Sequence, residues 1–377
     1  MNVIMFHSIG MQNSRARYAF LSFPFQHFEH FCRYLASQGI KTGFLADWHR
    51  NLEKGITDKH VYLTFDDGFA DNWVYAYPIA KKYLVKFSIF VNPEFIQMGD
   101  TPRKTMLDGG FQDESGENIG YLNWPELREM QRSGLVDIQS HSMSHTWYPT
   151  GPQVIDIARP DNPYQYPWLL WNRNPSLKSD YLNSPQLLPQ AVSPVFENGR
   201  SLGIRRHLFS EEQLAEIEDF LRREYSDACD ARALIGRLNQ FILGKRILGR
   251  METDAELIER YLYELRESKR TLEAGLDKEV DFLCWPGGAY NQTSVSLSRE
   301  VGYKASTLAS KGDKNPLSFP GYYRIPRFGL SSLWYWQQGE PRFHRQIPIL
   351  SFQSRFYGKK SLAGIGLRLI RKIKTSK

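Results

Sequence analysis

Residues 61–68 read VYLTFDDG, and residues 135–145 read LVDIQSHSMSH. Each stretch begins as a β-rich apolar run and ends in side chains that bind metal ions, two aspartates in the first and two histidines in the second. Parallel strands present the residues at their carboxyl ends along one edge of the sheet. We therefore expect the two groups to meet at the mouth of a parallel sheet.

The spacing within each group predicts separate roles. Neighbouring strand residues point to opposite sides, so Asp66 and Asp67 do different jobs unless the strand has ended between them. His141 and His145 are four residues apart, so both imidazoles can meet one ion if a helical turn lies between them. A hydrolase with one divalent ion needs few protein ligands, an open position for water and a nearby base. We assign Asp67, His141 and His145 to the metal and Asp66 to the base.

These motifs resemble the signatures of the polysaccharide deacetylase family, carbohydrate esterase family 4, also known by its homology to the nodulation-type chitooligosaccharide deacetylases. The family shows a Thr-Phe-Asp-Asp-Gly strand end and a His-Ser/Thr-x-x-His segment. A third stretch, FLCWPGGAYN at residues 282–291, looks like the Pro-aromatic-Gly-x-x-Asn groove wall. The chain departs from that pattern at Gly287, where the family has an aromatic residue, and lacks the arginine often found before the proline. The resemblance implies substrate contacts at Trp285, Pro286, Gly288, Tyr290 and Asn291.

The resemblance spans roughly residues 2–145 and 255–330 and implies a deformed (β/α) barrel that hydrolyses N-acetyl groups of amino sugars in a glycan. In that family the aspartate corresponding to Asp66 deprotonates the attacking water, and those corresponding to Asp67, His141 and His145 hold the ion.

The general acid is expected in an unusual place. The Leu-x-His motif that commonly supplies it is absent, and residues 324–329, RIPRFG, occupy that region. The chain opens with VIMFHS at residues 3–8. This looks like the motif order of the biofilm poly-N-acetylglucosamine deacetylases, in which the acid histidine comes from the first strand. We assign the acid role to His7, with a strand-end cap as the alternative, and expect Arg327 to reach Asp66 from another strand.

The rest of the chain predicts one α/β barrel with a large insertion. The motifs flank residues 146–250, so we assign the barrel to residues 1–145 and 251–340, the insertion to 146–250, and a basic tail to 341–377. Helices are expected at 25–38, 72–83, 124–132, 254–273 and 295–301, and further strands at 86–91, 281–285 and 304–308. The insertion begins as an aromatic and Pro-rich loop and continues as charged helices over 210–244.

Aromatic residues gather at the start of the insertion, directly after His145. These residues could stack on sugar rings, or they could be buried and hold the loop together. A loop of this length is commonly a lid. The aromatic residues are Trp147, Tyr164, Tyr166, Trp168 and Trp171. Trp147 is our candidate substrate contact among them.

Charge is concentrated in the tail. The formal net charge is +7, yet ten basic and no acidic residues follow residue 340, so the preceding part carries 38 basic against 41 acidic residues, a net charge of −3. Residues 362–373 place apolar side chains on one helical face and basic ones on the other. This pattern predicts peripheral contact with anionic lipid headgroups, with packing on the barrel as the alternative. No role for nucleic acid is expected.

The amino-terminal sequence lacks the basic and long apolar segments of a signal peptide, no span of about eighteen apolar residues exists, and three cysteines give no disulfide framework. We expect a cytoplasmic protein, with the tail holding it at the inner face of the membrane.

The leading interpretation is a metal-dependent hydrolase that removes N-acetyl groups from a glycan or a lipid-linked surface-polysaccharide precursor. A deformylase or an O-acetyl esterase on a glycan would use the same metal chemistry, and a non-catalytic glycan-binding protein would keep the fold. Two histidines and one aspartate favour zinc and also admit cobalt, nickel, manganese or iron.

Overall fold

The computed structural model describes residues 2–10, 21–57, 59–111, 120–162, 165–182, 191–307, 323–330, 334–337, 340–343 and 346–357. The predicted basic helix over residues 362–373 and the aromatic residue Tyr164 lie outside these ranges. Within them, no helix has the length and apolarity needed to cross a bilayer.

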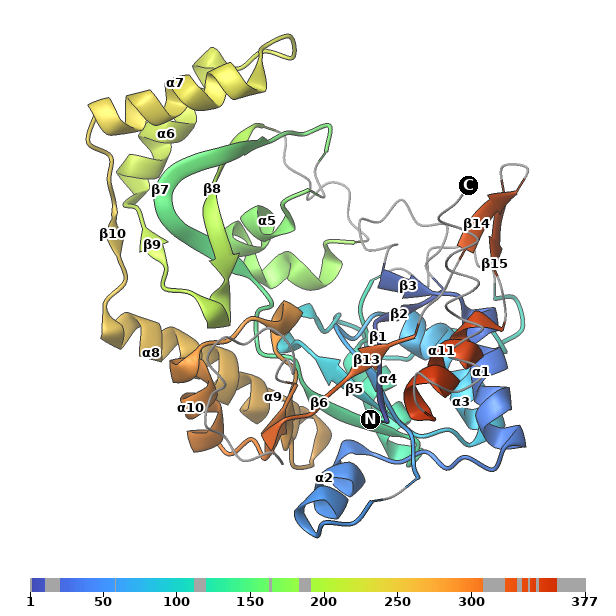
Figure 1. Cartoon of the computed structure of the whole chain (residues 1–377). Coiled ribbons are helices and arrows are strands. Elements are labelled where there is room, and N and C mark those ends of the chain that lie inside the picture. Colours follow the sequence, from blue (N-terminus) through green and yellow to red (C-terminus); the bar gives the residue numbers. More distant parts are fainter. Residues whose placement is uncertain are drawn as a thin grey trace.

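Seven strands form the central sheet (Figure 1). Their order across the sheet is β12, β11, β6, β5, β4, β1 and β13, and every neighbouring pair is parallel. The strands are β1 (Val3–Phe6), β4 (Tyr62–Phe65), β5 (Phe87–Val91), β6 (Val136–Ser140), β11 (Phe282–Leu283), β12 (Ala305–Ser306) and β13 (Phe328–Gly329). This arrangement confirms the predicted α/β fold.

The segment from residue 324 to residue 329 joins the two edges of this sheet. Arg324 forms an isolated parallel bridge with Ser306 of β12, and the amide of Ile325 donates to the carbonyl of Ser306 over 2.8 Å. Four residues after the bridge, Phe328 pairs with Ile4 of β1. The sheet therefore curls round on itself through a short strand, as expected for a deformed barrel.

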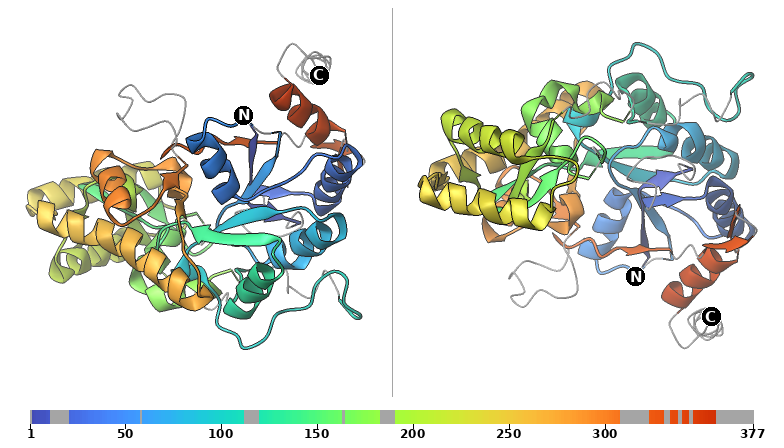
Figure 2. Two further views of the ribbon diagram at one scale, coloured as in Figure 1. Left: turned by 90° about the horizontal axis from the view of Figure 1, so that it is seen from below. Right: turned by 90° about the horizontal axis from the view of Figure 1, so that it is seen from above.

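Helices surround the curved sheet (Figures 1 and 2). They are α1 (Phe25–Ser37), α2 (Leu45–Glu53), α3 (Tyr77–Tyr83), α4 (Trp124–Arg132), α8 (Asp254–Leu262), α9 (Ser268–Leu276), α10 (Gln292–Glu300) and α11 (Ile347–Phe356). Two π-helical segments interrupt the helical stretches, η2 (Asn72–Ala76) before α3 and η8 (Tyr263–Glu267) between α8 and α9. The five barrel helices predicted from the sequence match these positions closely. For α4, Asn123 and Glu126 cap each other's backbone amides over 3.0 and 2.9 Å, which fixes where the helix begins.

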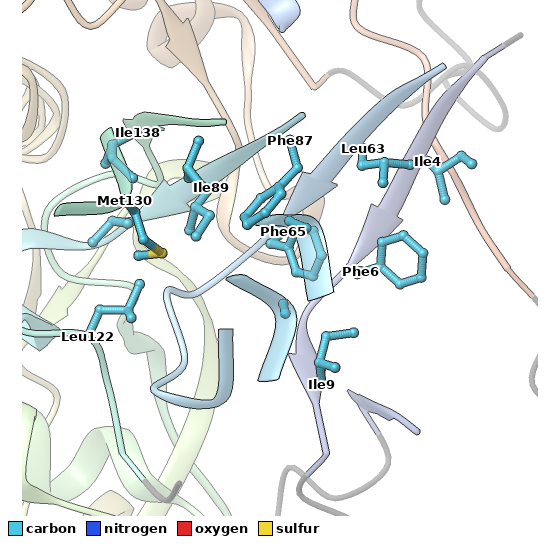
Figure 3. Close-up of a cluster of buried hydrophobic side chains, with 14 of the residues drawn as sticks. Ile4, Phe6, Ile9, Leu63, Phe65, Phe87, Ile89, Leu122, Met130 and Ile138 are labelled. Carbon is cyan, nitrogen blue, oxygen red and sulfur yellow. The ribbon is translucent and has the colours of Figure 1, made fainter. Parts of the chain in front are cut away.

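Apolar side chains from neighbouring strands fill the space between sheet and helices (Figure 3). Ile4, Leu63 and Phe87 come from adjacent strands, and Met130 of α4 lies beside Ile138 and Leu122. Strands β4 and β5 are buried along their whole length. Both faces of the sheet are covered, which is why these strands read as continuous apolar runs and not as alternating ones.

The insertion forms a lobe beside the barrel (Figures 1 and 2). Its base is an antiparallel hairpin of β7 (Trp147–Ala158) and β8 (Ser193–Arg200), with α5 (Pro167–Arg173) between the two strands in sequence. Helices α6 (Glu211–Glu224) and α7 (Ala231–Gly244) share a separate apolar core with the hairpin. The helices match the prediction, whereas the expected irregular loop is largely a hairpin.

The other elements are short. Strand β2 pairs with β3, β9 with β10, and β14 with β15. Their bounds are β2 (Ser8–Ile9), β3 (Ser22–Phe23), β9 (His207–Leu208), β10 (Arg250–Met251), β14 (Trp334–Gln337) and β15 (Glu340–Phe343). Short 3-10 helices are η3 (Pro93–Phe95), η5 (Pro175–Asp180), η7 (Ser201–Gly203) and η9 (Pro286–Gly288).

Candidate metal centre

The two aspartates follow directly after β4, which ends at Phe65. The amide of Asp66 still donates to the carbonyl of Phe6 in β1 over 3.0 Å, as a continuing strand residue would. Asp67 has a φ of 72° and turns the chain out of the sheet. The neighbouring carboxylates therefore face different partners, as the division of roles requires.

Asp67 and the two histidines converge on one point. The Oδ1 atom of Asp67 lies 3.1 Å from Nε2 of His141 and 3.4 Å from Nε2 of His145. One ligand atom from each of the three residues lies within 4.8 Å of the others. The two imidazole rings are 5.1 Å apart and inclined at 62°. The sequence-predicted ligand set is thus assembled in space.

The segment between the histidines is an irregular loop and not a helical turn. Ser142 and His145 adopt positive φ values of 65° and 47°, and this brings the second imidazole back to Asp67. Asn92 at the end of β5 donates to the carbonyls of both His141 and Ser142. The assumption of a helical turn was wrong, although the two rings still meet.

A buried carboxylate holds the second half of this loop. Glu264, on the π-helical segment η8, accepts the amides of Met143 and Ser144 over 3.1 and 2.9 Å, and also the hydroxyl of Ser144. It also accepts the hydroxyl of Ser201 from the insertion over 2.9 Å. Four donors on one carboxylate make Glu264 the anchor of residues 141–145, the histidine loop. The sequence motifs did not point to it.

The donor set fits a divalent ion. Nδ1 of His141 lies 2.8 Å from the carbonyl oxygen of Cys284, which can only accept, so this nitrogen carries the proton. The Nε2 lone pair is then free to face an ion, the arrangement typical of metal-binding histidines. Burial raises the pKa of Asp67, but the neighbouring His141 and His145 lower it by more, so the pKa lies well below its usual value and the carboxylate is ionised and competent as a ligand.

Asp66 has its own two partners, Arg327 and His7. Arg327 donates from Nη1 to Oδ1 over 2.6 Å and from Nη2 to Oδ2 over 2.9 Å, a bidentate pair. Nε2 of His7 lies 3.8 Å from Oδ2 of Asp66. Burial alone raises the pKa of Asp66, but Arg327 and His7 outweigh it, so the pKa is lowered from its usual value. All three side chains predicted to perform the chemistry lie together.

Cys284 is a further member of the site that the sequence motifs did not mark. Its Sγ lies 3.4 Å from Oδ2 of Asp66 and 3.0 Å from Nη2 of Arg327. Its thiol, a carboxylate oxygen of Asp66 and a ring nitrogen of His141 form a second cluster compact enough for an ion. Only its position at the end of a strand, in line with the other motifs, could have indicated this.

The predicted groove wall needs correction. Trp285 is only 1% exposed and packs in the main core, so its ring offers no face to a glycan. The side chain of Asn291 caps α10 through the amide of Ser294 and donates to the hydroxyl of Tyr261, so both ends of it are engaged in the fold. These two residues are structural, because the strand and helix of this βα unit use them.

The remaining predicted contacts differ in exposure. Pro286 is buried, whereas Gly288 is exposed and Tyr290 is half-buried. Trp147 is half-buried, with its ring 5.5 Å from that of His145. The other described aromatic residues of the insertion, Tyr166, Trp168 and Trp171, pack in a small core with Phe95, which favours the burial alternative for them.

Comparison with known proteins agrees with this geometry. The profile of a family described as polysaccharide deacetylase matches residues 53–163. A Bacillus subtilis (strain 168) protein named as a polysaccharide deacetylase, YxkH, is 30% identical over 150 residues. Residues 53–163 therefore resemble a polysaccharide deacetylase domain. The YxkH match covers 38% of this chain and 42% of that protein, so it spans less than half of either polypeptide.

A solved structure shares this fold over more of the chain. The BpsB deacetylase domain from Bordetella bronchiseptica superposes over 87% of this chain and 95% of its own, with a TM-score of 0.50 and 17% identity. A de-N-acetylase from Aggregatibacter actinomycetemcomitans covers 87% and 92%, with a TM-score of 0.49 and 15% identity. At these identities, the BpsB match supports the fold alone.

Proposed function

We propose that this protein is a metal-dependent hydrolase that removes N-acetyl groups from an amino-sugar-containing glycan. One observation carries the proposal: a three-residue ligand set and an ionised, arginine-bound carboxylate lie side by side at the carboxyl ends of β4 and β6, the two neighbours of β5. We assign the metal to Asp67, His141 and His145, and infer zinc, because two histidines and a carboxylate with an open position are typical of catalytic zinc sites.

A divalent ion held there would polarise the acyl carbonyl and acidify a water molecule. Because the pKa of Asp66 is lowered, its carboxylate is ionised at neutral pH and can take the proton from that water. The water oxygen then bonds to the acyl carbon, and the bond from carbon to nitrogen breaks. We assign to His7, whose Nε2 lies 3.8 Å from Oδ2 of Asp66, the supply of the proton that the leaving amine needs. The products are acetate and a free amino sugar.

Two departures from the family pattern are consistent with the alternative of a glycan-binding protein that has no catalytic activity. No arginine precedes Pro286, but Arg327, directly before β13, supplies a bidentate guanidinium to Asp66. The aromatic residue missing at Gly287 is replaced by another side chain, as described below. With both positions filled, the geometry supports an enzyme.

The test is acetate release from N-acetylglucosamine oligomers and from a lipid-linked glycan extract. The protein would be stripped of metal and reloaded with zinc, cobalt or nickel. We expect metal to restore release, and Asp66→Asn to abolish it while metal binding persists. Glycan binding with no acyl product from the metal-loaded protein would contradict the proposal, and formate in place of acetate would redefine the acyl group.

A further inference from the structure

An arginine of the insertion fills the space above Gly287. A Cβ atom built on Gly287 would lie 0.6 Å from Nη1 of Arg200, and the glycine has a φ of 52°, in the left-handed region. No larger residue fits at position 287 while Arg200 is in place. A guanidinium group from the insertion therefore stands where the family pattern has an aromatic ring.

The backbone around Arg200 is tied to the histidine loop. Arg200 ends β8 and pairs in register with Trp147 of β7, and its guanidinium carbon lies 5.0 Å from the centre of the Trp147 ring. The amide of the next residue, Ser201, donates to the carbonyl of Thr146 over 2.9 Å, and its hydroxyl donates to Glu264. Glu264 thus positions both the histidine loop and the backbone next to Arg200.

The guanidinium has an unused donor. Nη1 of Arg200 is shielded from solvent and has no hydrogen-bond acceptor among the described residues. Burial lowers the pKa of Arg200 and Asp67 partly offsets this, but a guanidinium remains charged. A buried charged donor without an acceptor is costly, so an acceptor from outside the chain is expected. Arg200 lines a small cavity together with His145 and Pro286.

The charge around the site favours an anion as that acceptor. Arg327 and Arg200 offset the charges of Asp66 and Asp67, so among these four groups a divalent ion would leave an excess of two positive charges. Such a site stabilises negative charge that develops on an oxygen atom, most strongly where water is excluded.

We propose that Arg200 is a further catalytic residue: it donates to the acyl oxygen as negative charge builds on that oxygen, and then to the carboxylate of the acetate product. This inference rests on the proposed function, since it names a donor for the same reaction. A carboxylate or phosphate group on the glycan has the same chemistry as an acceptor, and the experiment separates the two sources.

The experiment compares zinc-loaded wild type with Arg200→Met and Arg200→Lys. The matched control is Arg205→Met, an arginine five residues on that pairs with Asp254. Calorimetry would give acetate affinity, and turnover of a neutral chitooligosaccharide would give kcat and KM. In Arg200→Met we expect roughly 100-fold lower kcat, as for loss of an oxyanion donor, and about tenfold weaker acetate binding. Zinc content should not change, Arg200→Lys should recover part of both, and the control should match wild type.

Unchanged kcat and acetate affinity in Arg200→Met would overturn the inference. So would a loss confined to N-acetylglucosamine 6-phosphate with the neutral substrate unaffected, since the acceptor would then be a substituent of the glycan. A zinc-loaded wild type that releases no acetate from any glycan would refute the proposed function instead, and the acetate-affinity comparison would still decide whether Arg200 binds carboxylate.

Discussion

Asp66 owes its ionised state to Arg327, and this gives a test at the residue scale. Without Arg327, the effect of burial dominates, and burial raises the pKa of the Asp66 carboxyl group. In Arg327→Met the acid limb of the pH profile of kcat/KM should therefore move to higher pH, and activity at neutral pH should fall by roughly 100-fold. Zinc content serves as the control and should stay constant. An acid limb that does not move would mean that Asp66 is not the base, or that Arg327 does not set its pKa.

Asp71 makes stability depend on pH. It is fully buried, it accepts the hydroxyl of Ser8, and burial raises its pKa to about 7. The folded state then binds more protons than the unfolded state between pH 3.8 and about 7, so this stabilisation is complete below pH 3.8 and is lost as the pH rises to about 7. The loss is of order 4 kcal/mol, since each pKa unit corresponds to about 1.4 kcal/mol.

Urea unfolding at pH 5 and pH 8 checks this. Wild type should be less stable at pH 8, and Asp71→Asn should remove much of the difference because an amide does not ionise. The same pH dependence in both proteins would show that Asp71 is not the source.

Side chains in the sequence motifs could be predicted, whereas their distant partners could not. Asp66, Asp67 and the histidines stand at strand ends in short patterns that carry their chemistry. Arg327 contacts Asp66 across 261 residues of chain, and only a family resemblance suggested it. Glu264, Cys284 and Arg200 acquire their roles from the packing of segments that have no shared sequence pattern.

At the scale of elements, the π-helical segment η8 positions the histidine loop. Removing the carboxylate in Glu264→Ala leaves buried donors of that loop unpaired, which should destabilise the protein by about 3 kcal/mol. Zinc affinity should fall 10- to 100-fold, the usual effect of losing a group that orients ligands. The control is Glu267→Ala, in the same segment, whose carboxylate pairs with exposed Arg270. Unchanged zinc affinity in Glu264→Ala would show that the loop holds its shape without this anchor.

The barrel elements could be predicted because each carries a clear signal. Mostly apolar runs marked β4 and β5, alternating apolar residues marked β6, and helical spacing marked α1. The β7–β8 hairpin lacked such a signal, since Pro149, Gly151 and Pro152 interrupt β7 and the pairing register shifts between Pro149 and Val154. Its partner strand lies more than thirty residues away, so only tertiary packing reveals the pair.

For the whole molecule, the basic tail remains a prediction from sequence. We expect the full chain to sediment with anionic liposomes at low salt and a chain ending at residue 358 to bind much less, since each basic residue near such a surface contributes on the order of 1 kcal/mol. Higher salt should weaken the binding. Equal behaviour of the two proteins would refute a membrane role for the tail.

The most direct test of the whole account is the number of zinc ions bound per chain, measured by native mass spectrometry after dialysis against buffered zinc. We predict one ion in wild type and in Asp66→Asn, and none in Asp67→Ala or His145→Ala. Zinc retained by Asp67→Ala and His145→Ala, or no zinc on wild type, would contradict the metal centre on which the proposed chemistry depends.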